Sequence, residues 1–84
     1  MLKGIEYTQE SAYLRGLGKF DEAIDIIENN IENIDISIQS IAWLAAFYAA
    51  KEKNDTNIAL KYAKLVAKDD PNIPTIKKYL SSQA

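Results

Sequence analysis

The fold is decided by the stretch Gly18-Lys-Phe-Asp-Glu-Ala-Ile-Asp-Ile-Ile-Glu28, whose pattern continues to Ile34. Apolar side chains recur in it at steps of three and four residues, the spacing of one face of an α-helix, and acidic side chains lie mostly off that face. Gly18 can take the left-handed conformation that ends a preceding helix. The sequence therefore predicts two helices that meet at a tight turn, the second over residues 18–34. Its apolar face consists of Phe20, Ala23, Ile24, Ile27, Ile31 and Ile34.

Length and composition limit both the fold and the chemistry. The 84 residues fit one small domain, and no run of residues alternates between apolar and polar as a half-buried strand would. The chain has neither Cys nor His, which excludes disulfides, Cys or His metal sites and every His-dependent catalytic triad. We therefore expect an all-α domain that is not an enzyme and that uses no cofactor or metal.

The net charge of −2 conceals an uneven distribution. Residues 1–37 hold three basic and eight acidic side chains, whereas residues 38–84 hold seven basic and four acidic ones. An acidic half is a poor surface for nucleic acid, so no nucleic-acid partner is expected. Two interpretations stay open. The charges either solvate the helix surfaces, or they attract one copy of the chain to another and produce weak self-association.

Membrane and targeting signals are not found in the sequence. No apolar run reaches the roughly 18 to 20 residues of a membrane span, and no basic region followed by an apolar signal core stands at the N-terminus. We therefore expect no membrane insertion and a cytoplasmic location.

Polar breaks between the apolar segments divide the chain into five predicted helices. Ser37 is a plausible N-cap for the third, and its almost uniformly apolar sequence predicts burial between other helices. Asp55 or Thr56 caps the fourth, which ends before Asp70-Pro71. The predicted helices cover about residues 2–16, 18–34, 37–52, 56–67 and 75–82.

The chain also repeats itself. The segment Phe20 to Ile24 returns as Thr56 to Leu60, and Leu44-Ala45 returns as Leu80-Ser81, both 36 residues later. In the first helices the match has a spacing of 34 instead, which would place two extra residues in the second turn, near Lys53, because insertions belong in turns. That match pairs Tyr7, Ser11 and Leu14 with Ile41, Ala45 and Tyr48.

At these residues the chain resembles the tetratricopeptide repeat (TPR) family, whose unit is a helical hairpin of about 34 residues. The segment from Gly18 to Ile27 is similar to the turn and second helix of the unit, and Leu44-Ala45-x-x-Tyr48 is similar to its first helix. Ala59 and Pro71 match the second helix and the closing Pro. The chain departs from the family pattern at Glu10, Asn30, Asp35 and Ala63.

This resemblance implies a single TPR-like domain over residues 1–84, built as a short right-handed α-solenoid of antiparallel helical hairpins. Repeat one would cover about 4–37, repeat two about 38–73, and a capping helix about 74–83. The first helix of each repeat would line a concave groove.

The resemblance also implies that a partner peptide or helix binds in this groove. Some family members hold chaperone C-termini with a clamp of Lys, Asn and Arg, and this chain does not have that clamp, so we do not expect a receptor for chaperone tails. The implied groove residues are Thr8, Ala12, Arg15, Gln39, Ala42, Trp43, Ala46, Ala49, Lys78 and Tyr79.

Trp43 distinguishes two registers of the third helix. If the second turn has the family length, the indole is buried against the fourth helix, whereas a turn two residues longer rotates it toward the groove. The matches of Leu44, Ala45 and Tyr48 favour the longer turn and hence the groove.

Two kinds of function remain. The leading one is a protein–protein interaction module, a scaffold that holds a partner peptide or helix in the groove. The alternative is a structural or self-assembling module that stacks on further repeats or on a second copy and has no groove ligand.

Overall fold

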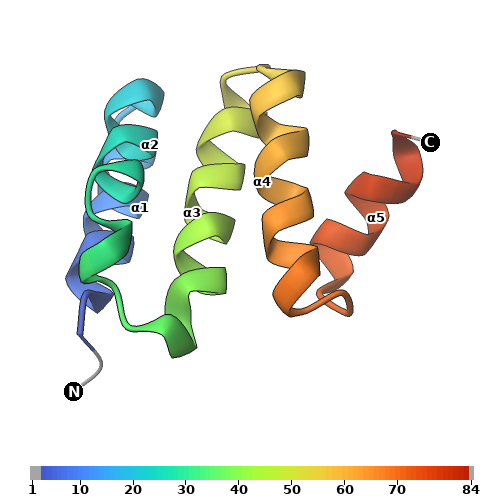
Figure 1. The fold of residues 1–84 in the computed structure, drawn as a ribbon. Helices are drawn as coiled ribbons and strands as arrows, with labels where there is room; N and C mark the ends of the chain where they lie inside the picture. The colour runs from blue at the N-terminus through green and yellow to red at the C-terminus, as the bar shows by residue number, and fades with distance from the viewer. Residues whose placement is uncertain (1–2, 84) are drawn as a thin grey trace.

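Five α-helices follow one another in the computed structural model, which describes residues 3–83 (Figure 1). No strand occurs among the described residues, so the prediction of an all-α fold with five helices is confirmed. Leu2, predicted as the start of the first helix, lies outside the described residues. The helices are α1 (Ile5–Gly16), α2 (Phe20–Glu28), α3 (Gln39–Glu52), α4 (Thr56–Asp69) and α5 (Pro74–Ser82), with short 3₁₀ turns η1 (Ile31–Asn33) and η2 (Ile36–Ile38) between α2 and α3.

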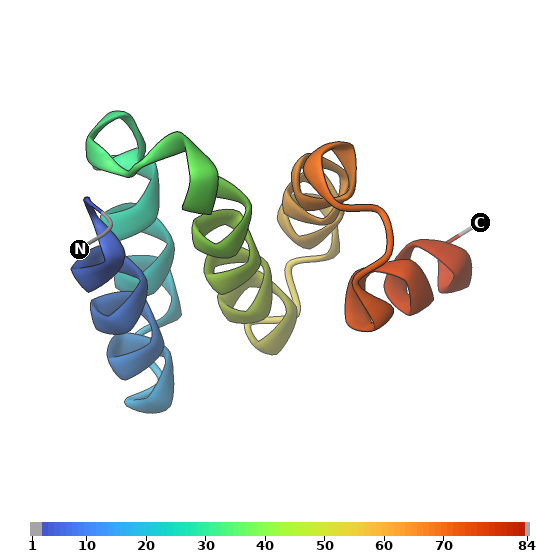
Figure 2. The same ribbon diagram turned by 90° about the horizontal axis from the view of Figure 1, so that it is seen from below.

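The helices form a row with α1 and α2 at one end and α5 at the other (Figures 1 and 2). The described chain measures 36 × 27 × 17 Å, and the row runs along its longest dimension. Helix α3 contacts α1, α2 and α4, as its apolar sequence predicts, while α5 packs on α4.

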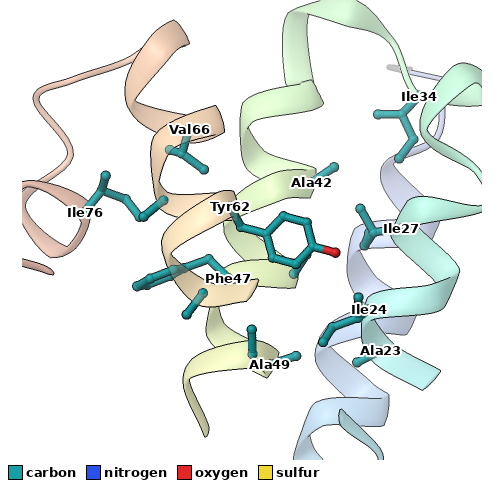
Figure 3. Packing of buried hydrophobic residues seen from close by; sticks show 14 of the residues in the cluster. Ala23, Ile24, Ile27, Ile34, Ala42, Phe47, Ala49, Tyr62, Val66 and Ile76 are labelled. Atoms are coloured by element: carbon teal, nitrogen blue, oxygen red, sulfur yellow. The ribbon is translucent and has the colours of Figure 1, made fainter. Parts of the chain in front are cut away.

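The core is built from large side chains on α2 to α5 and from alanines that let the helices approach closely (Figure 3). Ala23 and Ala59 are completely buried, which agrees with the close packing expected of small residues. Between α1 and α2 the buried hydroxyl of Ser11 donates to the carbonyl oxygen of Ala23 at 2.8 Å. The largest fully buried side chains are those of Tyr62, Phe47, Ile27, Ile76 and Val66.

The turns of the two helical hairpins are alike. Residues 17–19 join α1 to α2 and residues 53–55 join α3 to α4, with Gly18 and Asn54 at φ of 77° and 69°. The residue after each of them donates its N–H to a carbonyl five residues earlier, the bond of a Schellman cap. The expectation of a second turn two residues longer is therefore wrong. Both helices of the first hairpin correspond to those of the second at a spacing of 36 residues. The two residues beyond the family length of about 34 therefore lie in the connection between α2 and α3.

The connection between the hairpins begins earlier than the apolar stripe predicts. Helix α2 ends at Glu28, not at Ile34, and the chain continues into η1. The side-chain amide of Asn30 donates to the carbonyl oxygen of Ile26 at 2.8 Å, in place of a further turn of helix. Ile34 is buried all the same, so this connection supplies part of the core.

Local side-chain caps fix the starts of the later elements. Ser37 is not an acceptor at the start of α3. Its N–H and hydroxyl donate to the Asp35 carboxylate at 3.0 and 2.7 Å, and this carboxylate caps η2. Both hydrogen bonds lower the pKa of Asp35, and the bond from the hydroxyl has the larger effect. Asp55 is confirmed as the N-cap of α4, because its carboxylate accepts the N–H of Ile58 at 3.1 Å.

Gly4 holds the start of the described chain against the connection between the hairpins. Its φ is 90°, and a Cβ built on it would lie 2.7 Å from the Cα of Ile34. Next to it the carbonyl oxygen of Lys3 accepts the N–H of Asp35 at 2.8 Å. This close approach requires glycine at position 4.

Candidate functional site

A surface groove of about 310 Å³ lies between α1 and α3, which we call the α1–α3 groove. Its lining is mainly apolar, and Ile41 in it is 49% exposed although it is a large aliphatic residue. The lining residues are Thr8, Gln9, Ala12, Arg15, Ile41, Leu44, Ala45 and Tyr48.

Helical periodicity explains why these residues share one surface. Thr8, Ala12 and Arg15 follow one another at steps of four and three residues on α1, and Ile41, Leu44 or Ala45, and Tyr48 do the same on α3. Each wall therefore spans seven residue-to-residue steps, roughly 10 Å at 1.5 Å per residue.

Two of the polar side chains around this groove, Thr8 and Arg15, already have partners within the described residues. The hydroxyl of Thr8 donates to the carbonyl oxygen of Ile5 at 2.6 Å. The Arg15 guanidinium pairs with Glu52 on α3 and lies 5.1 Å from the centre of the Tyr48 ring. Arg15 therefore joins α1 to α3 at one end of the groove and is not a free cation for a ligand.

The structure brings together the three residues predicted on α1 but replaces those predicted on α3. Thr8, Ala12 and Arg15 all line the groove. Ala42, Ala46 and Ala49 do not reach it, because all three are completely buried in the core. The observed lining residues of α3 lie two positions after four of the predicted ones, 39, 42, 43 and 46. They are Ile41, Leu44, Ala45 and Tyr48. This shift of two positions arises because the two extra residues lie between α2 and α3, and not in the turn between α3 and α4 as predicted.

Gln39 and Trp43 also lie elsewhere. The Gln39 amide donates to the carbonyl oxygens of Ile34 and Ile31 at 3.1 and 3.3 Å, so it holds the connection between the hairpins. Trp43 is half-buried and stacks on Tyr62 of α4, with ring centres 5.5 Å apart and planes at 16°. Its placement against α4 contradicts the favoured register and agrees with the alternative of a turn of family length. Trp43 borders a separate hollow of about 430 Å³ between α3 and α4.

Tyr62 links three helices behind Trp43. Its side chain extends from α4 toward Ile27 on α2 (Figure 3), and its hydroxyl donates to the carboxylate of Glu28. Burial, and then this hydrogen bond, raise the pKa of Tyr62. The residue is therefore structural, with no access to the α1–α3 groove.

The two residues predicted on α5 are also outside the α1–α3 groove. The side chain of Lys78 is exposed on α5. The rings of Tyr79 and of Phe47 on α3 form an edge-to-face pair with their centres 5.0 Å apart. Tyr79 also borders a small, more polar hollow of about 180 Å³ beside the α3–α4 turn. The groove seen here is therefore formed by α1 and α3.

Sequence reasoning missed Gln9 on α1 and the four lining residues of α3. The sequence held a signal for the correct register, since the segments Phe20 to Ile24 and Thr56 to Leu60 are 36 residues apart. The second turn, residues 53–55, contains no Gly or Pro that would mark an insertion. Applying the same spacing to the first helices would have placed Ile41 and Leu44 opposite Ile5 and Thr8.

Other kinds of site are not indicated within the described part of the chain. Among residues 3–83 no group of three or more carboxylates is placed to hold a metal ion, and none of the described helices is both long and apolar enough to cross a membrane. Comparisons with protein families, with curated proteins and with solved structures find nothing that matches this chain.

Proposed function

We propose that this chain is a protein-interaction module of the TPR-like kind, a scaffold that holds a helix of a partner protein in the α1–α3 groove. The repeat character is supported by the matching turns, with Gly18 and Asn54 in the same conformation 36 residues apart, and by the buried Ala23 and Ala59 at the same spacing. On this proposal α1–α2 and α3–α4 are the two repeats, α5 covers the second, and the chain acts in the cytoplasm without being an enzyme.

The observation that carries the binding proposal is the exposed apolar lining of the groove. Leu44, Ala45 and Tyr48 are only partly covered, and Ile41 beside them is half exposed. Leaving such a surface in water is unfavourable, and an apolar patch in a concave surface is typical of a binding site.

Dimensions and chemistry both favour a helix as the ligand. The groove walls span about two helical turns, which is the length over which an amphipathic helix presents residues i, i+3 or i+4, and i+7. A helix brings its backbone hydrogen bonds with it, whereas an extended peptide needs donors and acceptors from the groove. The lining offers few such groups, because Thr8 and Arg15 already have partners. Among the described lining residues only Gln9 and the Tyr48 hydroxyl remain.

A selection from a displayed library of 16-residue amphipathic helices tests the proposal. We expect the selected peptides to share an apolar i, i+3 or i+4, i+7 pattern and to bind less tightly to the variant Ile41→Ala. Loss of the contact should weaken binding about tenfold, since burying an aliphatic side chain is worth about 1.5–3 kcal/mol and 1.4 kcal/mol is tenfold.

The matched control is Leu17→Ala, because Leu17 is 53% exposed and lies outside the groove lining. This variant should bind the selected peptides as the unchanged protein does. Failure to select any binder, or binders that the Ile41 and Leu17 variants affect equally, would show that the groove is not the binding surface.

A further inference from the structure

The two ends of the row of helices carry opposite charge. Helices α1 and α2 hold six acidic side chains and one basic one, Arg15, which is already paired with Glu52. Helices α4 and α5 hold five lysines and one acidic side chain, Asp69. The charge asymmetry of the sequence thus corresponds to helices on opposite sides of α3, whose positions Figures 1 and 2 show.

Most of these charges are available at the surface. Four acidic side chains of α1 and α2 are exposed and form no ion pair within residues 3–83, and the same holds for four lysines of α4 and α5. We call these two sets the acidic end and the basic end. Lys3 and Lys19 near the first, and Asp69 and Asp70 near the second, only partly offset them. The sets are Glu6, Glu10, Glu22 and Asp25, and Lys64, Lys68, Lys77 and Lys78. Lys68 borders the hollow beside Trp43 between α3 and α4, so it lies at the margin of the basic end.

The acidic end also exposes two large apolar side chains. Tyr13 is 62% exposed and Leu17 is 53% exposed. They continue the line of Glu6 and Glu10 at steps of three and four residues, so the four side chains form one stripe along α1. Lysine side chains suit such a stripe, because their aliphatic stems cover apolar surface and their ammonium groups interact with aromatic rings.

We propose that the acidic end of one copy of this chain docks on the basic end of a second copy. Tyr13 and Leu17 supply the apolar contact, the acidic residues of α1 face Lys77 and Lys78 of the other copy, and each added copy leaves one acidic and one basic end unoccupied. Such a head-to-tail contact is heterologous and adds copies in a line or a ring. This surface is distinct from the α1–α3 groove, so the proposal does not depend on the proposed function.

Sedimentation of the full chain at increasing salt tests this proposal first. Between 0.01 M and 1 M NaCl the Debye length falls from about 30 Å to about 3 Å, so the association constant should decrease at least about tenfold. A chain that is monomeric at millimolar concentration and low salt, or an association that salt leaves unchanged, would overturn the proposal.

Charge-reversed variants then identify the surfaces. Glu6→Lys with Glu10→Lys removes the acidic stripe, and Lys77→Glu with Lys78→Glu removes the basic end, so each variant alone should be monomeric. A mixture of the two variants should associate, because each still has the end that the other can bind. Lys61→Glu, on α4 beside Glu28 of α2, is the control inside the row. It changes the net charge by −2, half the change made by Lys77→Glu with Lys78→Glu, and should associate like the unchanged chain.

The mixture also separates this proposal from general charge effects. A mixture that stays monomeric while the unchanged chain associates would overturn the head-to-tail arrangement. Ile41→Ala, which alters only the groove, should leave the association constant unchanged, so failure of groove binding and failure of self-association give different results.

Discussion

Replacing Gly4 by alanine tests the contact that fixes the first hairpin to the connection after it. The added Cβ would lie 2.7 Å from the Cα of Ile34 and 2.8 Å from the carbonyl oxygen of Asn33, both backbone atoms that cannot rotate away. The φ of 90° adds a second penalty, since this conformation is unfavourable for any residue with a Cβ.

The magnitude follows from these two terms. The backbone conformation costs about 1–2 kcal/mol and the overpacking about 1–3 kcal/mol. Together they approach the about 3–5 kcal/mol that a core of this size supplies. We therefore expect Gly4→Ala to unfold at much lower urea concentration, or to release the start of the chain from Ile34.

The other two glycines provide matched controls. Gly18 has a φ of 77° but nothing within 4 Å of an added Cβ, so Gly18→Ala should show the conformational cost of about 1–2 kcal/mol alone. Gly16 ends α1 with ordinary helical geometry and open space, so Gly16→Ala should gain up to about 1 kcal/mol.

Urea unfolding followed by circular dichroism ranks the four proteins, and hydrogen exchange at the Asp35 amide detects local release, because that N–H bonds to Lys3. The expected order of stability is Gly16→Ala, the unchanged chain, Gly18→Ala and then Gly4→Ala. The reasoning is refuted if Gly4→Ala is no less stable than Gly18→Ala and the Asp35 amide stays equally protected.

Two further predictions concern the core. Ala23→Leu and Ala59→Leu should each lower the free energy of unfolding by about 1–3 kcal/mol through overpacking. Ala12→Leu, on the exposed groove wall, should lower it far less. Equal melting temperatures for all three variants would contradict the close packing of helices at Ala23 and Ala59. Because burial and the bond to Glu28 raise the pKa of Tyr62 above its usual value of 10.0, the native state keeps the phenolic proton that the unfolded state loses. Stability should therefore fall as the pH rises above about 10, and urea titrations at each pH should show a smaller fall for Tyr62→Phe than for the unchanged chain.

The sequence was sufficient where apolar and polar residues alternate clearly. In α2 the contrast between the apolar stripe and the charged positions marks the inward side, so the packing of Ala23 could be predicted. Helix α1 lacks this contrast, because its buried residues Thr8 and Ser11 are polar. The position of Thr8 in the groove came from the resemblance to the TPR family. The N-cap of α4 could be narrowed from the sequence to Asp55 or Thr56, and Asp55 is the one that accepts the N–H of Ile58.

The orientation of α3 could not be obtained in the same way. Almost every side chain from Ile41 to Ala50 is apolar, so the pattern lacks the contrast that would distinguish core from groove. Its orientation depends on how residues 29–38 turn. That turn depends on the side-chain hydrogen bonds of Asn30 and Gln39 and on the close approach of Gly4 to Ile34. A shift of two residues turns α3 by about 200°, enough to exchange Ala42 with Leu44.

The separation of charge along the row also gives the molecule a large electric dipole moment. A chain of net charge −2 is expected to behave as a weak anion, but this one presents lysines at one end of a row along its 36 Å dimension and carboxylates at the other. At low ionic strength it should therefore adsorb to both cation- and anion-exchange media, by opposite ends. A charged partner would meet it in a preferred orientation before any contact forms, and that alignment would govern the association rate.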